Sequence, residues 1–388
     1  MNFRRNKNLL LFLISFLSLF IEMFLIRWNP ACAKIIGYYT NLILIACFLG
    51  LGIGMAGKKA QSKWLFEFPF LFFILNLALL IFVLAGIYPY PALPSWGENL
   101  FWYQTGYIPS IIVIPIAFIL NALVLIPLGK EIGRLFEQSN SLKAYLVNLL
   151  GSLLGVIVFG LVNFIYPNPL LFSGIGLLLY LVFLRLSSRA IRNQILSLLI
   201  CLLTLGIIFW AKGDTIWSPY YKIKLSKWFR FESFDKKGVF QIPNGFVLEV
   251  NDDFHQYVFD LKPETLANLE KDDSFAYQCI IGFIRYTYFP FLLLDSPGKV
   301  LILGAGTGND VAFAIESSAK EIDAVEIDPI IAKLGIKFHP ERPYQNNRVH
   351  LYINDARNYL KKSSKKYDLI VYGFLDSHTL SSSLSSVR

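Results

Sequence analysis

The chain has 388 residues, of which 55% are apolar and only 16% are charged, and its formal net charge is +9. This composition excludes an ordinary soluble globular protein, in which roughly a quarter of the residues are charged. The positive charge does not predict nucleic-acid binding, because many lysines and arginines stand at the ends of apolar runs, where they orient membrane helices. No metal site is expected, since the four cysteines lack metal or disulfide spacing. His339 and His378 likewise have no metal-like partners, so loop or surface positions are expected for both.

Residues 1–212 are predicted to form an integral membrane domain of α-helices. Apolar runs close to the roughly 20 residues that cross a bilayer follow one another up to Trp210. The first run is interpreted as a retained helix, because it is long for a signal peptide and "RWNPACAK" is a poor cleavage site. The seven candidate spans are residues 8–27, 35–56, 65–88, 109–128, 144–166, 169–185 and 195–211.

The distribution of basic residues predicts how these spans are oriented. Lysines and arginines cluster before the first span and after the second, fourth and sixth, whereas the loop 89–110 has none and carries interfacial aromatic residues. The N-terminus is therefore expected in the cytoplasm, and the protein in a plasma membrane of bacterial type. Seven spans would leave the C-terminal half outside, away from a cytosolic cofactor, so the side on which that half lies stays open.

Two features inside the predicted spans suggest roles for particular residues. Glu22 stands alone in an apolar helix, where a carboxyl is costly enough to indicate either a function or a structural role. The structural alternatives are a pair, with Arg27 as a possible partner, or a protonated acid in the bundle. Small residues in 49–57 and 149–160 predict close contact between helices.

Residues 213–262 are predicted to form a small β unit, because short β-like runs are separated there by turn residues. Residues 263–388 have the pattern of an α/β domain. A helical stretch leads into the buried strand "KVLILG", and three further strands follow in "IDAVEID", "RVHLYIND" and "YDLIVYGFLDSH". The chain stops just after the fourth of these strands, so we expect an incomplete domain from a truncated sequence.

Polar groups and glycines gather at the carboxyl ends of these strands, where open α/β sheets bind ligands. Gly304, Gly306 and Gly308 form a turn before a helix N-terminus, which allows close approach of a ligand to the backbone. The second strand ends in Glu326, the better candidate for a ribose-binding carboxylate, with Asp328 as the second. The third strand ends in Asp355. An acid before a helix is also an ordinary N-cap, and glycine turns occur for structural reasons.

These residues together resemble the S-adenosylmethionine-type fold and, within it, the spermidine/spermine synthase (aminopropyltransferase) family. The resemblance rests on "VLILGAGTGND", "AVEIDPII", "FHPE", "NRVHLYINDARNYL" and "YDLIVYGFLDS", and more weakly on "SPYYKI", "VLEVNDDFHQ" and "FAYQCI". The N-terminal half is similar to membrane regions fused to such domains. The implied architecture is a transmembrane helical bundle of about seven spans, a small β unit and a Rossmann-like, methyltransferase-type α/β domain.

The resemblance also implies a cofactor, S-adenosylmethionine or its decarboxylated form, and roles for individual residues. The glycine turn would border the amino-acid-like end of the cofactor, Glu326 would bind the ribose hydroxyls, and Asp355 with Ala356 would meet the adenine. In the fourth-strand motif Gly373 holds the position of the usual base, and Asp376 matches the second Asp and is the candidate catalytic residue. The family's Tyr-His pair reads Tyr277-Gln278 here. The cofactor-binding set is Gly304, Ala305, Gly306, Gly308, Glu326, Asp328, Asp355 and Ala356.

Three functions are compatible with this sequence. The first is a membrane-integral transferase that moves an aminopropyl or related group to a small-molecule amine or another nucleophile. The second is a methyltransferase, since the glycine turn and the acids bind the donor without fixing which group leaves. The third is a transporter-like membrane protein whose nucleotide-binding domain does not catalyse. The expected partners are the lipid bilayer and the small-molecule acceptor, without nucleic acid, and a homo-oligomer stays open.

Overall fold

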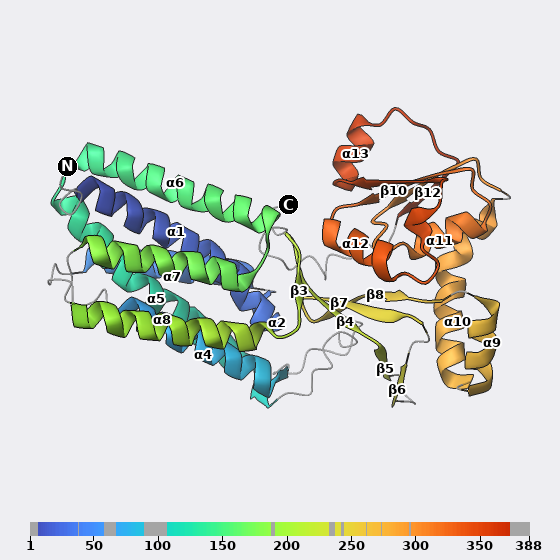
Figure 1. The fold of residues 1–388 in the computed structure, drawn as a ribbon, viewed down its shortest axis with the longest axis horizontal. Helices are drawn as coiled ribbons and strands as arrows, with labels where there is room; N and C mark the ends of the chain where they lie inside the picture. The colour runs from blue at the N-terminus through green and yellow to red at the C-terminus, as the bar shows by residue number, and fades with distance from the viewer. Residues whose placement is uncertain are drawn as a thin grey trace. The chain divides into compact units, whose positions relative to one another are not determined.

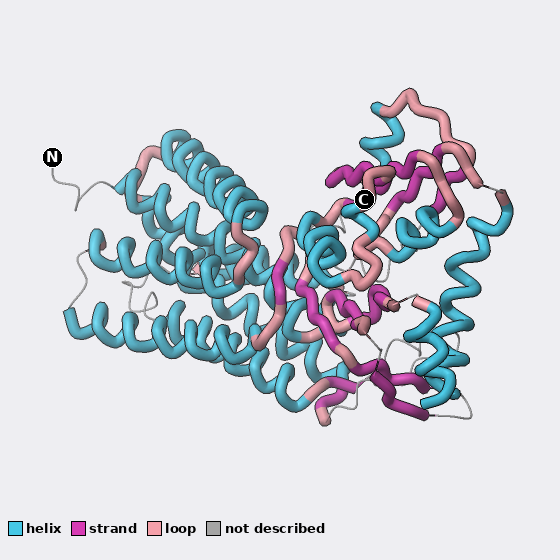
Figure 2. The backbone as a smooth tube through the Cα atoms, turned by 45° about the vertical axis from the view of Figure 1, so that its right-hand side comes forward, coloured by secondary structure: helices cyan, strands magenta, loops and turns pink. Residues whose placement is uncertain are grey.

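The computed structural model describes residues 7–37, 39–57, 67–88, 107–187, 191–232, 237–241, 244–260, 262–272, 274–294 and 296–372. The chain forms two compact units that divide between Thr215 and Ile216. The first is largely helical, whereas the second combines helices and strands (Figure 2). The small β unit and the α/β domain therefore belong to one compact unit.

The first unit is a bundle of helices arranged around α1 (Figure 1). The helix α1 packs through Phe20 against Phe159 of α6 and through Phe24 against Phe72 of α4. Such a helix is apolar on all sides because it is surrounded by other helices. The elements are α1 (Lys7–Cys32), α2 (Lys34–Gly37), α3 (Thr40–Ala56), α4 (Glu67–Ala85), β1 (Ile87–Tyr88), β2 (Ile108–Pro109), α5 (Ser110–Glu137), α6 (Ser141–Ile165), α7 (Pro169–Leu186) and α8 (Ile191–Lys212).

Among the described residues, six helices are long and apolar enough to cross a membrane by length and composition: α1, α4, α5, α6, α7 and α8. They coincide with six of the seven predicted spans. The prediction for the remaining span, 35–56, is wrong in length, because the chain leaves the helical conformation at Tyr39, with φ −124° and ψ 41°. The helix α3 that follows has 17 residues.

Close packing at glycine holds pairs of these helices together, as the small-residue patterns predicted. A Cβ atom at Gly50 of α3 would lie 2.1 Å from the carbonyl oxygen of Ala122 in α5, and Gly54 is as tightly placed one turn later. In α6, Gly151 and Gly155 make the same kind of approach to the backbone of α1. Any side chain at these positions would separate the helices, so glycine sets the distance between them.

The second unit begins with a small antiparallel sheet. Its strands run in the order β3-β4-β7-β8. The inner face of this sheet, with Ile223 and Leu248, packs against Ile331 and Leu334 of a helix in the α/β part, α12. The elements are β3 (Ile216–Trp217), β4 (Lys222–Ser226), the hairpin β5 (Trp228–Glu232) and β6 (Lys237–Gln241), β7 (Phe246–Val250), β8 (Asp253–Val258), α9 (Pro263–Asp272), α10 (Ser274–Tyr288) and the 3₁₀ helix η4 (Phe289–Leu293).

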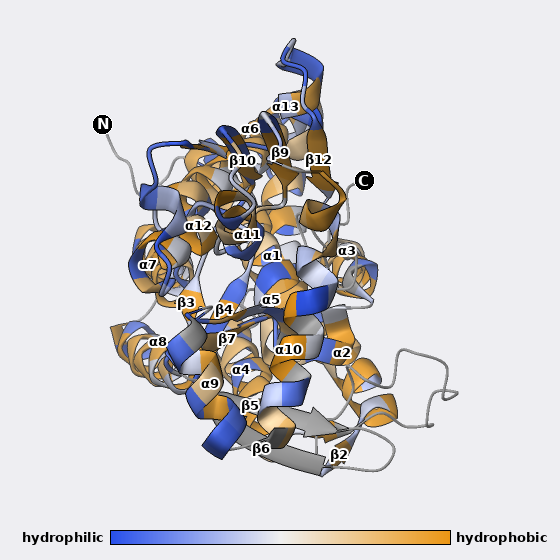
Figure 3. Cartoon of the chain, turned by 90° about the vertical axis from the view of Figure 1, so that its right-hand side faces the viewer, coloured by the Kyte–Doolittle hydropathy of each residue, from blue (hydrophilic) through white to orange (hydrophobic). Residues whose placement is uncertain are grey.

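A parallel sheet of four strands follows, in the order β11-β10-β9-β12. Successive β9 residues alternate between its two faces: Val300 and Ile302 join the core with α11, and Leu301 and Leu303 join the core with α13. Because both faces are covered, the four residues of β9 after the exposed Lys299 are all hydrophobic (Figure 3). The elements are β9 (Lys299–Leu303), α11 (Asn309–Glu316), β10 (Glu321–Glu326), α12 (Pro329–Phe338), the 3₁₀ helix η5 (Pro343–Gln345), β11 (Val349–Ile353), α13 (Ala356–Lys362) and β12 (Leu369–Tyr372).

This strand order is that of a Rossmann-type half sheet, in which the chain moves outward from β9 to β11 and then returns to the other side of β9 with β12. The strands β9 and β10 lie next to each other in its centre, with Leu303 paired to Val325. The glycine turn after β9 and the acid at the end of β10 are therefore brought together at the carboxyl edge of the sheet.

Candidate cofactor-binding site

The turn after β9 requires glycine at three positions. Gly304, Gly306 and Gly308 have φ values of +75°, +57° and +106°, a region that other residues rarely adopt. The turn is also anchored to β10, because the N–H groups of Gly304 and Ala305 both donate to the carbonyl oxygen of Val325, at 2.9 and 3.0 Å. The predicted cradle is therefore a rigid turn, and its backbone faces the end of β10.

Glu326 links this turn to the start of α12. One carboxyl oxygen, Oε2, accepts the N–H of Gly306 at 2.8 Å, and the other, Oε1, accepts the N–H of Asp328 at 2.8 Å. The side chain is buried, and burial raises the pKa of Glu326 to about 7, against the opposing effect of these backbone N–H groups. Glu326 is thus an acid placed by backbone donors at the sheet edge, with a pKa close to neutrality.

Asp328 and Asp355 both cap helices. Asp328 Oδ1 accepts the N–H groups of Ile330 and Ile331 at the start of α12, at 2.8 and 3.3 Å. Asp355 Oδ1 accepts the N–H of Asn358 at 3.0 Å, and Ala356 is the first residue of α13. The capping role that the sequence left open is therefore present at both aspartates, which also stand at the carboxyl ends of β10 and β11.

Tyr220 is a site residue that we did not predict individually. Burial is the largest influence that raises the pKa of Tyr220, and the negative charges of Asp328, Asp355 and Glu326 raise it further. The phenol of Tyr220, in the loop between β3 and β4, is therefore within electrostatic range of these three carboxyl groups. No sequence pattern distinguishes Tyr220 from its neighbour Tyr221, which packs into the core against α12.

Two further side chains hold the glycine turn from outside. The amide oxygen of Gln256, on β8, accepts both the N–H and the hydroxyl of Thr307, each at 3.0 Å. The hydroxyl of Tyr344, on η5, donates to the carbonyl oxygen of Gly306 at 2.8 Å. Gln256 ends the segment "VLEVNDDFHQ", which carried part of the resemblance, whereas Tyr344 lies in none of the quoted segments. Both contacts join segments that are distant in the sequence.

His339 lies in the loop directly after α12, as expected, but it is buried there rather than at the surface. Its Nδ1 accepts the N–H of Glu341 at 3.1 Å, which leaves the proton on Nε2, 3.2 Å from Asn309 Oδ1. Asn309 in turn donates through Nδ2 to the carbonyl oxygen of Tyr257. This chain of bonds ties the end of α12 to the start of α11 and to β8. His378 lies outside the described residues.

Acid is expected to destabilise the fold through His339. Burial lowers the pKa of His339 from 6.5 to about 4, so between these values the unfolded chain binds a proton that the folded chain does not. The contribution of His339 to the free energy of unfolding is complete above pH 6.5. It falls by up to about 3 kcal/mol as the pH drops from 6.5 to about 4. The measurement is the pH dependence of unfolding for His339→Gln, which should lack this component, with the exposed His350→Gln as the control. Equal profiles for the two variants would contradict the assignment.

A polar cluster at the opposite end of β10 is a network of ion pairs. Ligand atoms of Glu321, Asp323 and His350 lie within 4.8 Å of one another. The ammonium group of Lys365 lies 2.7 Å from Asp323 and 3.1 Å from Glu321, and that of Lys299 lies 2.8 Å from Glu321. These cations already balance the two carboxylates, so the arrangement does not favour a divalent metal ion.

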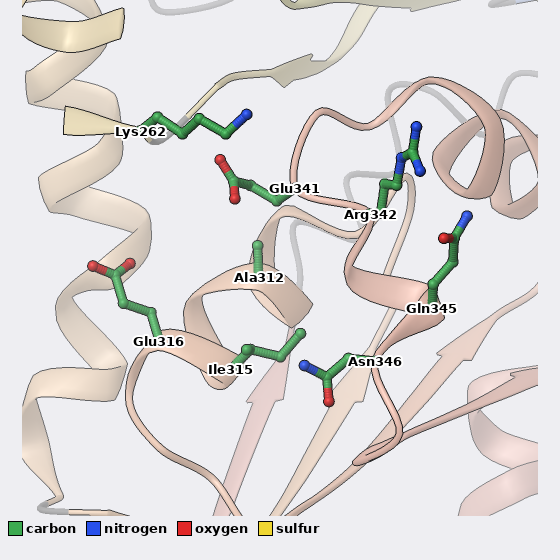
Figure 4. Close-up of a pocket in the computed structure, with 8 residues that line it drawn as sticks. All are labelled: Lys262, Ala312, Ile315, Glu316, Glu341, Arg342, Gln345 and Asn346. Carbon is green, nitrogen blue, oxygen red and sulfur yellow. The ribbon is translucent and has the colours of Figure 1, made fainter. Parts of the chain in front are cut away.

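A pocket of about 470 Å³ lies beside α11, away from the glycine turn. Charged side chains from Lys262, Glu316, Glu341 and Arg342 surround its apolar floor (Figure 4). Its lining includes neither the glycines nor the acids of the predicted set. The pocket therefore does not coincide with the candidate cofactor site formed by the turn and Glu326.

Asp376, the predicted catalytic residue, lies outside the described residues, as does Gly373. Of the Tyr277-Gln278 pair on α10, Tyr277 packs against a small core formed with α9, and Gln278 is exposed. The structure thus brings Gly304, Gly306, Glu326 and the two capping aspartates to one sheet edge, whereas the fourth-strand motif lies outside the described residues.

Comparison with known proteins agrees with this geometry. Residues 283–387 match the spermine/spermidine synthase domain. This part of the chain is therefore similar to spermidine synthase domains. It is 34% identical over 110 residues to a spermine synthase of Arabidopsis thaliana, a match that covers 27% of this chain and 29% of that protein. It is 31% identical over 114 residues to a polyamine aminopropyltransferase of Vibrio vulnificus, covering 28% of this chain and 38% of that protein.

Solved structures similar to the spermidine synthase-like domain include a spermidine synthase in complex with the transition-state analogue AdoDATO. That match has 17% sequence identity and a TM-score of 0.29, and it covers 42% of this chain and 47% of the other. The chain spans between 29% and 40% of the length of the first three curated relatives.

Proposed function

We propose that the chain is a membrane-integral transferase of the aminopropyltransferase type. It binds S-adenosylmethionine or its decarboxylated form and transfers an aminopropyl or related group to a small amine or another nucleophile. The observation that carries this proposal is the placement of Glu326, whose two carboxyl oxygens bind the N–H groups of Gly306 and Asp328 within a segment that matches the spermine/spermidine synthase domain.

The residues at the sheet edge fit an adenosyl donor. Gly306 adds no side chain to the turn. A Cβ atom at this position would lie 2.5 Å from Gln256 Oε1. Glu326 would accept the ribose hydroxyls, and Asp355 with Ala356 would hold the adenine at the end of β11. When bound, the donor supplies a carbon activated by its sulfonium group. The protein's part is to bind, orient and accept a proton.

Proton removal from the amine is assigned to Asp376. A base is needed because the attacking nitrogen must lose a proton as the new bond forms. Gly373 supplies no side chain where the family has its usual base, so Asp376 is the remaining carboxylate of that motif. A carboxylate there would also attract a cationic amine.

The helical unit anchors this domain in the bilayer. Six described helices have the length and composition of membrane spans. The clusters of basic residues between the runs place the N-terminus in the cytoplasm of a bacterial-type plasma membrane. The bilayer is then the partner of the first unit, and the small-molecule acceptor is the partner of the second.

Transfer by the full chain in lipid nanodiscs tests this proposal. With decarboxylated donor and putrescine, we expect aminopropylated product in the wild type and none in Asp376→Asn. Methyl transfer from S-adenosylmethionine instead would favour the methyltransferase and contradict the aminopropyl assignment. Donor binding without either transfer would show a binding domain and contradict catalysis.

A further inference from the structure

Several buried polar side chains of α1 have partners on neighbouring helices. Ser15 donates to Asn148 of α6 at 2.8 Å. Asn29 and Asn121 of α5 exchange two amide bonds, at 3.1 and 2.9 Å. Trp28 Nε1 donates to Asn76 of α4 at 2.9 Å. The interior of the bundle therefore satisfies its polar groups in pairs.

Glu22 departs from this arrangement. Its side chain is 2% exposed, and its Oε2 atom is buried without a hydrogen-bond partner in the described part of the chain. The Cys47 thiol of α3 lies within the electrostatic range of this carboxyl.

Arg27, the partner suggested by the sequence, is engaged elsewhere. Its guanidinium donates to Asn163 of α6 and lies over the ring of Phe172 of α7, 5.9 Å from the ring centroid. The two residues are five positions apart on one helix, so they point in different directions, about 140° apart. The expectation of a Glu22–Arg27 pair was therefore wrong.

In the described part of the chain, no cation compensates a negative charge at Glu22. The titratable group that faces it from the packed helices is Cys47, which is neutral or negative. On α5, Glu131 and Arg134 bind each other at 2.5 and 3.0 Å, so that cation is already balanced. An ionised carboxylate without a cation in such a place is very costly, whereas a neutral carboxylic acid costs far less.

We propose that Glu22 is a proton-binding site of the helical bundle, with its carboxyl held in the protonated form. The side chain is enclosed, and among the described residues Glu22 belongs to no group of acidic, histidine or cysteine side chains that could supply the several ligands of a metal ion. A proton, by contrast, needs neither room for a hydration shell nor several oxygen ligands. Protonatable carboxyls of this kind form the proton relays of membrane pumps and transporters. The inference does not depend on the reaction of the spermidine synthase-like domain.

Carbodiimide labelling of the full chain in nanodiscs tests the proposal, because the reagent modifies protonated carboxyls in apolar surroundings. Glu131 is the matched control, since it is equally buried but bound to Arg134. We expect Glu22 to be modified at least about tenfold faster than Glu131 at neutral pH, as located by mass spectrometry. Equal rates, or faster labelling of Glu131, would overturn it.

Two measurements decide the matter if the reagent reaches neither residue. The infrared carbonyl band of a protonated carboxyl should be present in the wild type and reduced in Glu22→Gln. Glu22→Gln should also keep the melting temperature, because it replaces one neutral group by another of the same shape, whereas Glu22→Lys should not fold. An unchanged band, or a large loss of stability in Glu22→Gln, would show that Glu22 is ionised and paired.

Discussion

Replacing Glu326 by alanine should weaken binding of the adenosyl donor by at least about 100-fold. The change removes the acceptor for the ribose hydroxyls and also frees the N–H groups of Gly306 and Asp328 that Glu326 holds at 2.8 Å. Hydrogen bonds to a charged group contribute about 1.5–3 kcal/mol each, and 2.8 kcal/mol corresponds to about 100-fold in affinity. The measurement is retention of labelled donor by the full-length variant.

Glu321 provides the control for this change, because it stands on the same strand at the opposite end. Its carboxylate is partly exposed and bound to Lys299 and Lys365. Exposed ion pairs contribute little, so Glu321→Ala should change donor affinity by about twofold or less. A comparable loss in both variants would mean that β10 is sensitive to any change, and would contradict the role given to Glu326.

Valine at Gly50 is expected to destabilise the helical unit strongly. A Cβ at this position would meet the carbonyl oxygen of Ala122 at 2.1 Å, and two backbones in contact cannot move apart without opening the α3–α5 interface. Overpacking of this kind costs about 3 kcal/mol or more. Thermal unfolding of the full chain in detergent measures the loss.

Gly52 is the matched control, two residues away on the same helix. A Cβ there has no other atom within 4 Å, so Gly52→Val adds the same side chain on an open face. The melting temperature of the Gly52→Val variant should stay close to that of the wild type. Equal destabilisation by both substitutions would point to helix propensity rather than to the contact with Ala122.

Hydrophobic periodicity was sufficient to predict most of the fold. Runs bounded by charge or proline became helices, and the buried strand "KVLILG" became β9, because both patterns report local burial. The division of the second apolar run was missed, although Gly37, Thr40 and Asn41 beside the break are weak helix formers.

The candidate site was predictable only where it follows from strand order. Parallel strands end at the same edge, so Glu326 and Asp355 could be placed without coordinates. The approach of Tyr220 depends on how the small sheet packs on α12, a contact between residues about a hundred positions apart. The burial of His339 likewise depends on Asn309, which no spacing rule connects to it.

Calorimetric titration of the full chain in nanodiscs with decarboxylated S-adenosylmethionine tests the central claim most directly. The placement of Glu326 beside the glycine turn predicts saturable binding at one site per chain, with the heat signal lost in Glu326→Ala. Heat of dilution alone in the folded wild type, or undiminished binding in Glu326→Ala, would contradict the assignment of this sheet edge as the donor site.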